Sequence, residues 1–401
     1  MFFQSLKKNY WKPFTLLIFE PFIKRERITD INKVISPSNY HEVNSILKQL
    51  NTEMPLAVQI YTKPYDVSPS ESLSLPFEWH QRQLRILEST RIGSFQKKYR
   101  TRKSYISYMK NACFSDGVLI DKSNNMNKDS VYHYFNIKIG IKKFPEKEII
   151  SIDEPVFYLG STRSYYHWIM DCLSALFLWK ELGLDRKMRL LVTDITDFKR
   201  KTLRAYGIPD KAVLEHKNTQ IIVKNIFIPS TIGGGQAWTP MQFLPEFHRK
   251  SVAHIKATSN ANEKIYISRS KTESRPMNNE KDVEIFLIKR GFDIVFLEDF
   301  TFHKQIELMK SASLIIAPHG AGLTNLIYCL PNTLIIELLC KRYLNTCFYL
   351  LSNISKLKYI PLVSSQYKVT GEHHHSYNWN TKIDELDKLL DHLEGSGSIS
   401  L

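Results

Sequence analysis

A histidine and two glycines lie just beyond a short apolar run in the second half of the chain. Residues 314–317 (LIIA) are long enough for a buried strand, and His319, Gly320 and Gly322 come soon after it. Glycine adopts backbone angles that are closed to other residues and lets a ligand approach the main chain. A helix that begins there directs free N–H groups and its positive dipole end at the turn, which suits a phosphate. His319 can add a donor or a proton. The alternative is a tight turn in an α/β domain that binds no nucleotide.

A second pair with chemical potential is His167 and Asp171, four residues apart in a stretch with helical character. At this spacing both side chains lie on one face of a helix. A carboxylate or imidazole near the start of that helix can accept a proton from a hydroxyl nucleophile. The alternative is an acidic residue favoured by the helix dipole, next to a histidine buried in the core.

Two arginines follow another apolar run. Residues 264–269 (KIYISR) predict a strand that ends in Arg269, and Arg275 lies in the polar loop beyond it. A guanidinium at the carboxyl end of a strand can bind a diphosphate in a bidentate way and neutralise a leaving group. The alternative for Arg269 is an ion pair on the surface.

The elements that must position these side chains alternate between strand and helix. In the second half, strands are expected at 264–269, 294–297, 314–317 and 334–338, and helices at 283–290, 302–310 and 323–330. This alternation is typical of a doubly wound parallel sheet with α/β architecture. Open sheets of this kind bind ligands beyond the carboxyl ends of their strands.

The first half carries fewer signals. A hairpin is expected at 111–120, a helix beginning near residue 165, a strand at 190–192, a helix at 198–206, one or two strands at 220–229 and a helix at 243–257. The glycine loop 231–240 could line a sugar site or serve as a linker. Nothing in the first 150 residues indicates a reaction.

Composition limits the class of protein. The chain has 401 residues and a net charge of +15, which favours anionic partners, while no nucleic-acid-binding motif is present. Its five cysteines are scattered without a CxxC pair, so neither a disulfide framework nor a zinc site is expected, and a reducing compartment is favoured. Three adjacent histidines at 373–375 cannot all face one metal ion from a regular element.

The amino-terminal residues 1–35 mix aromatic and basic side chains. Their longest apolar run, 14–19, is far shorter than the roughly 20 residues needed to cross a bilayer. Aromatic residues interleaved with lysines suit an anchor on an anionic membrane surface. The alternative is a segment packed on its own domain. We therefore expect a cytoplasmic protein that is peripheral on the inner face of a membrane.

Two stretches together resemble glycosyltransferase family 61. One is YYHWIMD at 165–171. The other includes KIYISR at 264–269, Arg275, Asn279–Glu280, Gly291–Phe292, Gln305, HGAGLTN at 319–325 and the IIEL that ends at Leu338. Their order and spacing match the family over roughly residues 155 to 340.

The resemblance implies a GT-B-like fold, in which two Rossmann-like domains face a central cleft. It implies transfer from a nucleotide sugar to a glycan hydroxyl with inversion, without a metal or other cofactor, and with UDP as one candidate nucleotide. Asp171 is then the first choice for the general base, with His167 as its neighbour or rival. The residues expected to bind the nucleotide sugar are Arg269, Arg275, His319, Gly320, Ala321, Gly322, Leu323, Thr324, Asn325 and Glu337, the last through ribose hydroxyls.

The resulting expectation is a glycosyltransferase of surface or capsular polysaccharide, or of a lipid-linked glycan. The expected parts are a membrane-surface segment at 1–35, an acceptor-side domain at 36–255, a nucleotide-sugar domain at 256–370, and a terminal helix and tail at 371–401. One alternative is a non-catalytic polysaccharide-assembly protein that binds a nucleotide or an anionic glycan. Another is an enzyme that uses His319 as a base on a different phosphorylated substrate.

Overall fold

The computed structural model describes a subset of the chain. The described residues are 65–66, 98–99, 106–115, 118–123, 127, 130, 150–160, 162–216, 220–230, 232–233, 240–258, 263–372 and 375–397. They divide into two compact units. Unit 1 holds the described residues from 106 to 233, and unit 2 holds those from 240 to 397 together with a short antiparallel pair, β1 (Tyr65–Asp66) and β2 (Lys98–Tyr99). The amino-terminal segment 1–35 lies outside the described residues.

Unit 2 is built on a parallel sheet. Its strands are β10 (Lys264–Ile267), β11 (Asp293–Val295), β12 (Leu314–Pro318), β13 (Leu334–Cys340) and β14 (Lys358–Ser364), in the spatial order β11-β10-β12-β13-β14. Every residue of β12 and β13 is buried, as expected for strands covered on both faces. The predicted doubly wound α/β sheet is confirmed for this unit.

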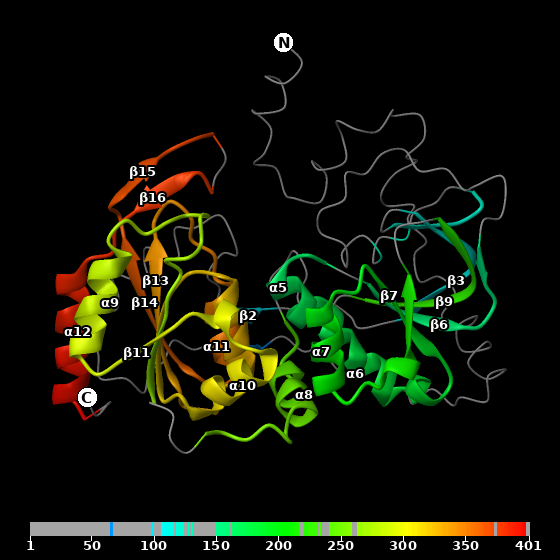
Figure 1. Cartoon of the computed structure of the whole chain (residues 1–401), viewed down its shortest axis with the longest axis horizontal. Coiled ribbons are helices and arrows are strands. Elements are labelled where there is room, and N and C mark those ends of the chain that lie inside the picture. Colours follow the sequence, from blue (N-terminus) through cyan, green and yellow to red (C-terminus); the bar gives the residue numbers. More distant parts are fainter. Residues whose placement is uncertain are drawn as a thin grey trace, which may run out of the picture. The chain divides into compact units, whose positions relative to one another are not determined.

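Helices cover both faces of this sheet (Figure 1). On one face lie α9 (Glu280–Lys289) and α12 (Ile383–Gly395), which share a hydrophobic core with the strands. On the other lie α10 (Phe302–Ser311), the helix η9 (Ala321–Tyr328) and α11 (Cys347–Ile354), with both α helices packed against η9. The helix predicted at 323–330 begins two residues earlier and is a tightly wound 3₁₀ helix. The sequence did not predict α11 or β14. It also did not predict the hairpin formed by β15 (Tyr367–Val369) and β16 (Tyr377–Trp379).

Arg290 joins α9 to α12. It forms ion pairs with Asp387, Asp391 and Glu394, which lie along α12, and its side chain is only 22% exposed. Because the acidic partners are partly in solvent, we expect Arg290→Ala to lower the free energy of unfolding by roughly 1 kcal/mol, and less at high salt. Urea unfolding at low and high salt measures this difference. The exposed pair Lys201–Asp197 is the control, since removing it should change little; an equal loss for Lys201→Ala would contradict the expected role of the Arg290 network.

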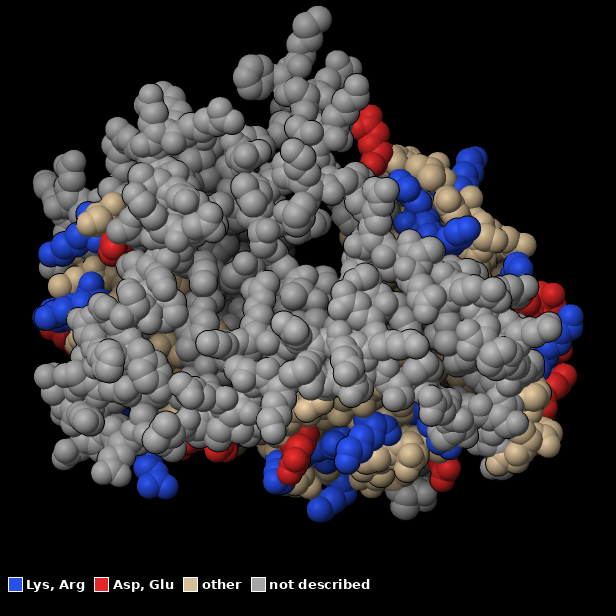
Figure 2. Space-filling view, turned by 180° about the vertical axis from the view of Figure 1, so that it is seen from behind, with Lys and Arg blue, Asp and Glu red and all other residues tan. Residues whose placement is uncertain are grey.

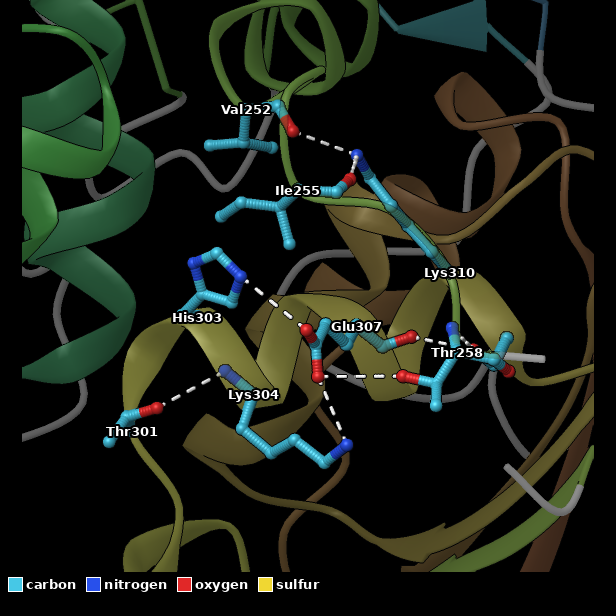
Figure 3. Close-up of polar contacts among 9 residues, drawn as sticks. Val252, Ile255, Thr258, Thr301, His303, Lys304, Glu307 and Lys310 are labelled. Atoms are coloured by element: carbon cyan, nitrogen blue, oxygen red, sulfur yellow. Dashed lines mark hydrogen bonds and ion pairs between the residues drawn. The ribbon is translucent and has the colours of Figure 1, made fainter. Parts of the chain in front are cut away.

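Helix α8 (Leu244–Ser251) also packs on η9. Its buried His248 lies against Tyr328, and Arg249 donates to the carbonyl of Cys329. The segment after α8 is held by Lys310 of α10, which donates to the carbonyls of Val252 and Ile255 at 2.8 and 2.6 Å (Figure 3). Residues 240–258 therefore belong to unit 2, whereas the sequence placed most of them before its predicted limit at 255.

Figure 3 also shows how Glu307 completes this attachment. Its carboxylate accepts from Thr258 and Lys304 and pairs with His303. Thus α10 is tied to the segment that follows α8, and both helices pack against η9.

Unit 1 contains a mixed sheet. Its strands are β3 (Ile106–Ser115), β4 (Val118–Ile120), β5 (Ser151–Ile152), β6 (Val156–Gly160), β7 (Arg189–Thr193), β8 (Val213–His216) and β9 (Ile221–Pro229), with the main order β4-β3-β9-β6-β7-β8. The pairs β9–β6, β6–β7 and β7–β8 are parallel, and β3 is antiparallel to β9. The predicted hairpin at 111–120 is confirmed by the pairing of β3 with β4.

The helical segment after β6 changes its winding twice. It consists of α5 (Tyr165–His167), a π-helical turn η4 (Trp168–Leu173) and α6 (Ser174–Glu181), and α7 (Asp197–Ala205) follows β7. Gly160 ends β6 with a φ of 80°, a left-handed conformation that glycine adopts without strain. This turn leads the chain from the carboxyl end of β6 into the helix.

Charged side chains of both signs are interspersed on the described surface that Figure 2 shows. In the described part of the chain, no helix is both long and apolar enough to cross a bilayer.

Candidate functional site

In unit 2, the order of the strands singles out one place for a ligand. The chain starts at β10, adds β11 on one side, and then returns to add β12, β13 and β14 on the other. The connections therefore diverge between β10 and β12, and open α/β sheets bind ligands beyond the carboxyl ends of strands at such a point. Arg269 follows β10, and His319 follows β12.

Arg269 and Gly320 meet at this point. An ideal Cβ built on Gly320 would lie 1.8 Å from Nη1 of Arg269 and 2.8 Å from its guanidinium carbon. The φ of Gly320 is −178°, which is extended backbone open to any residue. We expected a special backbone angle at Gly320 and Gly322, and neither has a left-handed φ. Glycine is needed at 320 because the arginine occupies the space of a side chain.

A buried carboxylate fixes the backbone of Arg269. Oε1 of Glu280 accepts from the N–H of Arg269 at 2.6 Å and also from the hydroxyl of Tyr266. The guanidinium itself donates through Nη2 to the carbonyl of Ser274 at 3.1 Å. Burial, with Arg275 as the next cause, lowers the pKa of Arg269 to about 10, so it stays cationic at neutral pH.

Arg275 is the second cation at this edge. Its φ of 55° is unusual for a residue with a side chain, and its carbonyl accepts from the indole of Trp379 in β16. The guanidinium carbon lies 5.0 Å from the ring centre of Tyr343, and Nε is buried without a hydrogen-bond partner among the described residues. Backbone strain and an unsatisfied buried donor often occur together where a ligand completes a site.

His319 lies beside these cations. Its Nδ1 is 2.5 Å from Oε1 of Glu337, and its ring packs against Tyr343 and Phe348. Burial lowers the pKa of His319; Glu337 opposes this shift, and Arg275 and Arg269 add to it. The imidazole is therefore neutral at neutral pH in the protein without a ligand.

Glu337 does not present its carboxylate to a ligand. It is 0% exposed, and its second oxygen accepts from the hydroxyl of Tyr359. The ribose role expected for Glu337 requires a carboxylate that a ligand can reach, and this carboxylate is fully buried between His319 and Tyr359. The contact of Tyr359 with Glu337 could not be predicted from the sequence, because the two residues lie on neighbouring strands.

The remainder of the predicted phosphate motif divides into two groups. Ala321 is exposed and Gly322 is partly exposed, so their main chain is accessible to a ligand. The side chains of Leu323, Thr324 and Asn325 are buried. Asn325 donates to Gln305 of α10, whose own amide donates to the carbonyl of Leu297. These three residues therefore hold the turn in place. The main chain of Ala321 and Gly322 is the part of the motif that a ligand can reach.

Unit 1 has its own divergence point, between β6 and β9. From β6 the chain adds β7 and β8 on one side and later returns to place β9 on the other. His167 and Asp171 belong to the helical segment that follows β6, and residues 232–233 follow β9. The predicted pair thus lies at the equivalent point of this sheet.

The structure brings His167 and Asp171 into contact. Nδ1 of His167 lies 2.7 Å from Oδ2 of Asp171, as the spacing of four predicted, although the turn between them is π-helical. Asp171 is 0% exposed and His167 is 8% exposed. Because the imidazole is the more accessible partner, it is the group better placed to meet an acceptor.

Gly233 belongs to the glycine loop that the sequence predicted to line a sugar site or to serve as a linker, and it lies against Asp171. An ideal Cβ on Gly233 would lie 1.5 Å from the carbonyl oxygen of Met170 and 2.9 Å from Oδ1 of Asp171. The loop after β9 therefore approaches the π-helical turn so closely that only glycine fits. The run of three glycines at 233–235 was the available signal.

We expect Gly233→Ala to reduce the free energy of unfolding by about 3 kcal/mol, because the added methyl group collides with backbone that cannot move aside. Thermal and urea unfolding measure this loss. Gly395→Ala in α12 is the matched control, since a Cβ there meets nothing within 4 Å. Equal stabilities for the two variants would contradict the close approach.

Comparison with known proteins bears on this arrangement. Residues 165–336 match the model of the family described as Glycosyltransferase 61. Over these residues the chain is similar to glycosyltransferase family 61. The match begins at Tyr165, just before His167, and ends one residue before Glu337. The predicted resemblance is confirmed.

The family 61 segment is also similar to a named plant enzyme. Over 89 residues the chain is 36% identical to beta-1,2-xylosyltransferase RCN11 of Oryza sativa subsp. japonica. This similarity covers 22% of the chain and 15% of the rice protein.

Among the described residues, no cluster of three or more His, Cys, Asp or Glu side chains could hold a metal ion.

Proposed function

We propose that this protein is a glycosyltransferase that moves a sugar from a nucleoside diphosphate sugar to a hydroxyl of a glycan acceptor, with inversion at the anomeric carbon. The observation that carries the proposal is the arrangement within the family 61 segment. One divergence point holds paired arginines and a glycine turn, and the other holds a buried histidine–carboxylate pair. Inverting transfer needs these two functions, a cation site for the leaving diphosphate and one base.

On the donor side, Arg269 and Arg275 bind the diphosphate oxygens. The close fit of Arg269 over Gly320 holds its guanidinium at the start of η9. The accessible main chain of Ala321 and Gly322 adds N–H donors at the helix start. In the transition state the bond between sugar and phosphate oxygen breaks, and these groups stabilise the negative charge that develops on the leaving diphosphate.

On the acceptor side, His167 removes the proton from the attacking hydroxyl as the new glycosidic bond forms. Asp171 accepts from Nδ1–H of His167, which leaves Nε2 as the basic atom, and stabilises the imidazolium once it has formed. The sequence favoured Asp171 as the base. The complete burial of Asp171 supports the reverse division, with His167 as the base and Asp171 as its positioning residue.

We further propose a GT-B architecture and UDP as the nucleotide of the donor. The printed name of the rice relative makes xylose one candidate for the transferred sugar. A role in surface or capsular polysaccharide, or in a lipid-linked glycan, rests on the resemblance to family 61, and the basic and aromatic segment 1–35 supports a place at the inner face of a membrane. Liposome flotation with and without anionic lipid tests the membrane part, and complete recovery of the protein away from anionic vesicles at low salt would contradict it.

A thermal-shift screen against sugar nucleotides tests the donor site. A ligand present at about 100 times its Kd adds roughly 2.7 kcal/mol to the stability of the native state. We expect a shift of the midpoint by several degrees with one nucleoside diphosphate sugar, and a smaller shift with nucleoside monophosphates. No shift with any nucleoside diphosphate sugar would contradict the proposed donor site.

A further inference from the structure

Three strands of unit 2 join His319, Glu337 and Tyr359 into one chain of hydrogen bonds. His319 follows β12, Glu337 lies in β13 and Tyr359 in β14, and these strands are neighbours in the sheet. One carboxylate oxygen faces Nδ1 of His319 and the other accepts from the hydroxyl of Tyr359. All contacts of the carboxylate are thus made within the protein, and Glu337 acts on a ligand only through His319.

The chain of bonds determines which nitrogen of the imidazole faces the site. Nδ1–H donates to Glu337, so Nε2 is the remaining ring nitrogen. Among the described residues Nε2 has no hydrogen-bond partner, and the side chain is 10% exposed. In the neutral ring Nε2 carries a lone pair, which repels a phosphate oxygen. To bind that oxygen, Nε2 must first gain a proton.

The charges around His319 oppose that proton in the protein without a ligand. Burial disfavours the imidazolium, and the cations Arg275 and Arg269 add to this effect, whereas Glu337 favours it. A bound diphosphate changes the balance, because its negative charges offset both arginines and offer Nε2 an acceptor. The buried carboxylate then stabilises the imidazolium from the opposite side of the ring.

We propose that His319 takes up a proton when the diphosphate of the donor binds, and that Glu337, held by Tyr359, is the positioning residue that makes this uptake possible. The inference rests on the proposed function. The proton comes from the buffer, adds to Nε2, and forms an N–H donor to a diphosphate oxygen. The new N–H bond forms from the Nε2 lone pair, the buffer acid becomes its conjugate base, and no bond of the sugar nucleotide is broken in this step. His319 thereby offers a hydrogen-bond donor to the leaving diphosphate only when the sugar nucleotide is bound.

Other titratable groups that face His319 keep their protons at neutral pH. Burial raises the pKa of Tyr343, whose ring contacts the imidazole, and burial together with Glu337 raises the pKa of Tyr359. Burial, with Glu337 as the next cause, also raises the pKa of Cys347 at the start of α11. Among these neighbours, His319 is therefore the group whose protonation can change on binding.

The sign of the pH dependence follows from this linkage. The pKa of His319 is lowered in the free protein and raised in the complex. Protons are taken up at any pH between the two values. Affinity is therefore highest below the pKa of His319 in the free protein. It falls by up to about tenfold per pH unit between the two pKa values and is constant above the pKa of the complex.

Calorimetric titration of the full chain in buffers with different ionisation enthalpies counts the protons. The probes are UDP-xylose, UDP-N-acetylglucosamine and GDP-mannose, whose diphosphate esters do not titrate near neutral pH. With a probe that binds, we expect uptake of about one proton per site for the wild type and almost none for Glu337→Gln or His319→Gln. Tyr359→Phe should give an intermediate number, and it keeps the test decisive should Glu337→Gln fail to fold. His303→Gln is the matched control, because His303 is an exposed histidine of the same unit.

The outcomes separate the two proposals. Binding with proton uptake that depends on Glu337 and Tyr359 supports the inference. Binding without uptake, or with equal uptake in all variants, overturns the inference and leaves the donor site intact. Failure of all three probes to bind overturns the proposed function, and the inference with it.

Discussion

Replacing Asp171 by asparagine should lower kcat by roughly 100- to 10,000-fold, because it disables the proposed base His167 and a positioned general base usually contributes a factor of this size. The asparagine amide cannot hold His167 with Nδ1–H directed at a carboxylate, and it cannot stabilise an imidazolium. Because the donor residues lie in the other unit, the Kd of the sugar nucleotide should stay within about twofold. Steady-state kinetics and calorimetry on the same preparation measure the two quantities.

Two further variants sharpen this test. His167→Gln should lose a similar factor, and the double variant should lose little more than either alone, since residues that act as one unit are strongly non-additive. Asp185→Asn, at an exposed acidic residue of the same unit, should leave kcat unchanged. Wild-type turnover by Asp171→Asn would remove the pair from the mechanism, and a protein that only binds glycan or nucleotide would show no turnover to lose.

Replacing Arg269 by alanine should weaken binding of the sugar nucleotide by about 100-fold, because hydrogen bonds to a charged group contribute roughly 1.5–3 kcal/mol each. The fold should survive, since Glu280 holds the main chain of residue 269 and not its guanidinium. Calorimetry or thermal shift gives the affinity, and circular dichroism confirms that the protein is folded.

Gly320→Ala offers an independent route to the same loss. The new methyl group would occupy the place of the Arg269 guanidinium and push it from the site without removing the charge. We expect a smaller decrease in affinity than for Arg269→Ala. Lys289→Ala, at an exposed lysine of α9, is the matched charge control. If Lys289→Ala weakened binding as much as Arg269→Ala, a general charge effect would replace the specific contact.

Local patterns in the sequence were enough to predict much of the scaffold. Short apolar runs between polar or turn-forming residues predicted β10, β12 and β13, and the spacing of His167 and Asp171 predicted their contact, because both signals depend only on neighbours along the chain. The contact between the Glu280 carboxylate and the main chain of Arg269 depends on how α9 packs beside β10. The contact between the Tyr359 hydroxyl and Glu337 depends on β14 becoming the neighbour of β13. The apolar pattern of a helix or strand does not specify which other elements will pack beside it.

The sequence also does not reveal why glycine is required at positions 320 and 233. At Gly320 and Gly233 the deciding factor is the presence of another part of the chain, a guanidinium in one case and a backbone carbonyl in the other. A sequence shows that a glycine is present without showing what approaches it. The role expected for Glu337 depended in the same way on an exposure that only the packed strands determine.

The π-helical turn at 168–173 sets the rotational phase of the helix on either side of it. A π turn contains one residue more than an α-helical turn would need to span the same path. If the same residues were wound as a continuous α-helix, which is locally the more favourable winding, His167 would rotate by roughly 100° relative to α6, since each residue of an α-helix turns it by about that angle. Deleting one residue from the turn would instead restore the α-helix and keep the two ends in phase. The less regular winding thus keeps the face that carries His167 and Asp171 aligned with the buried side of α6.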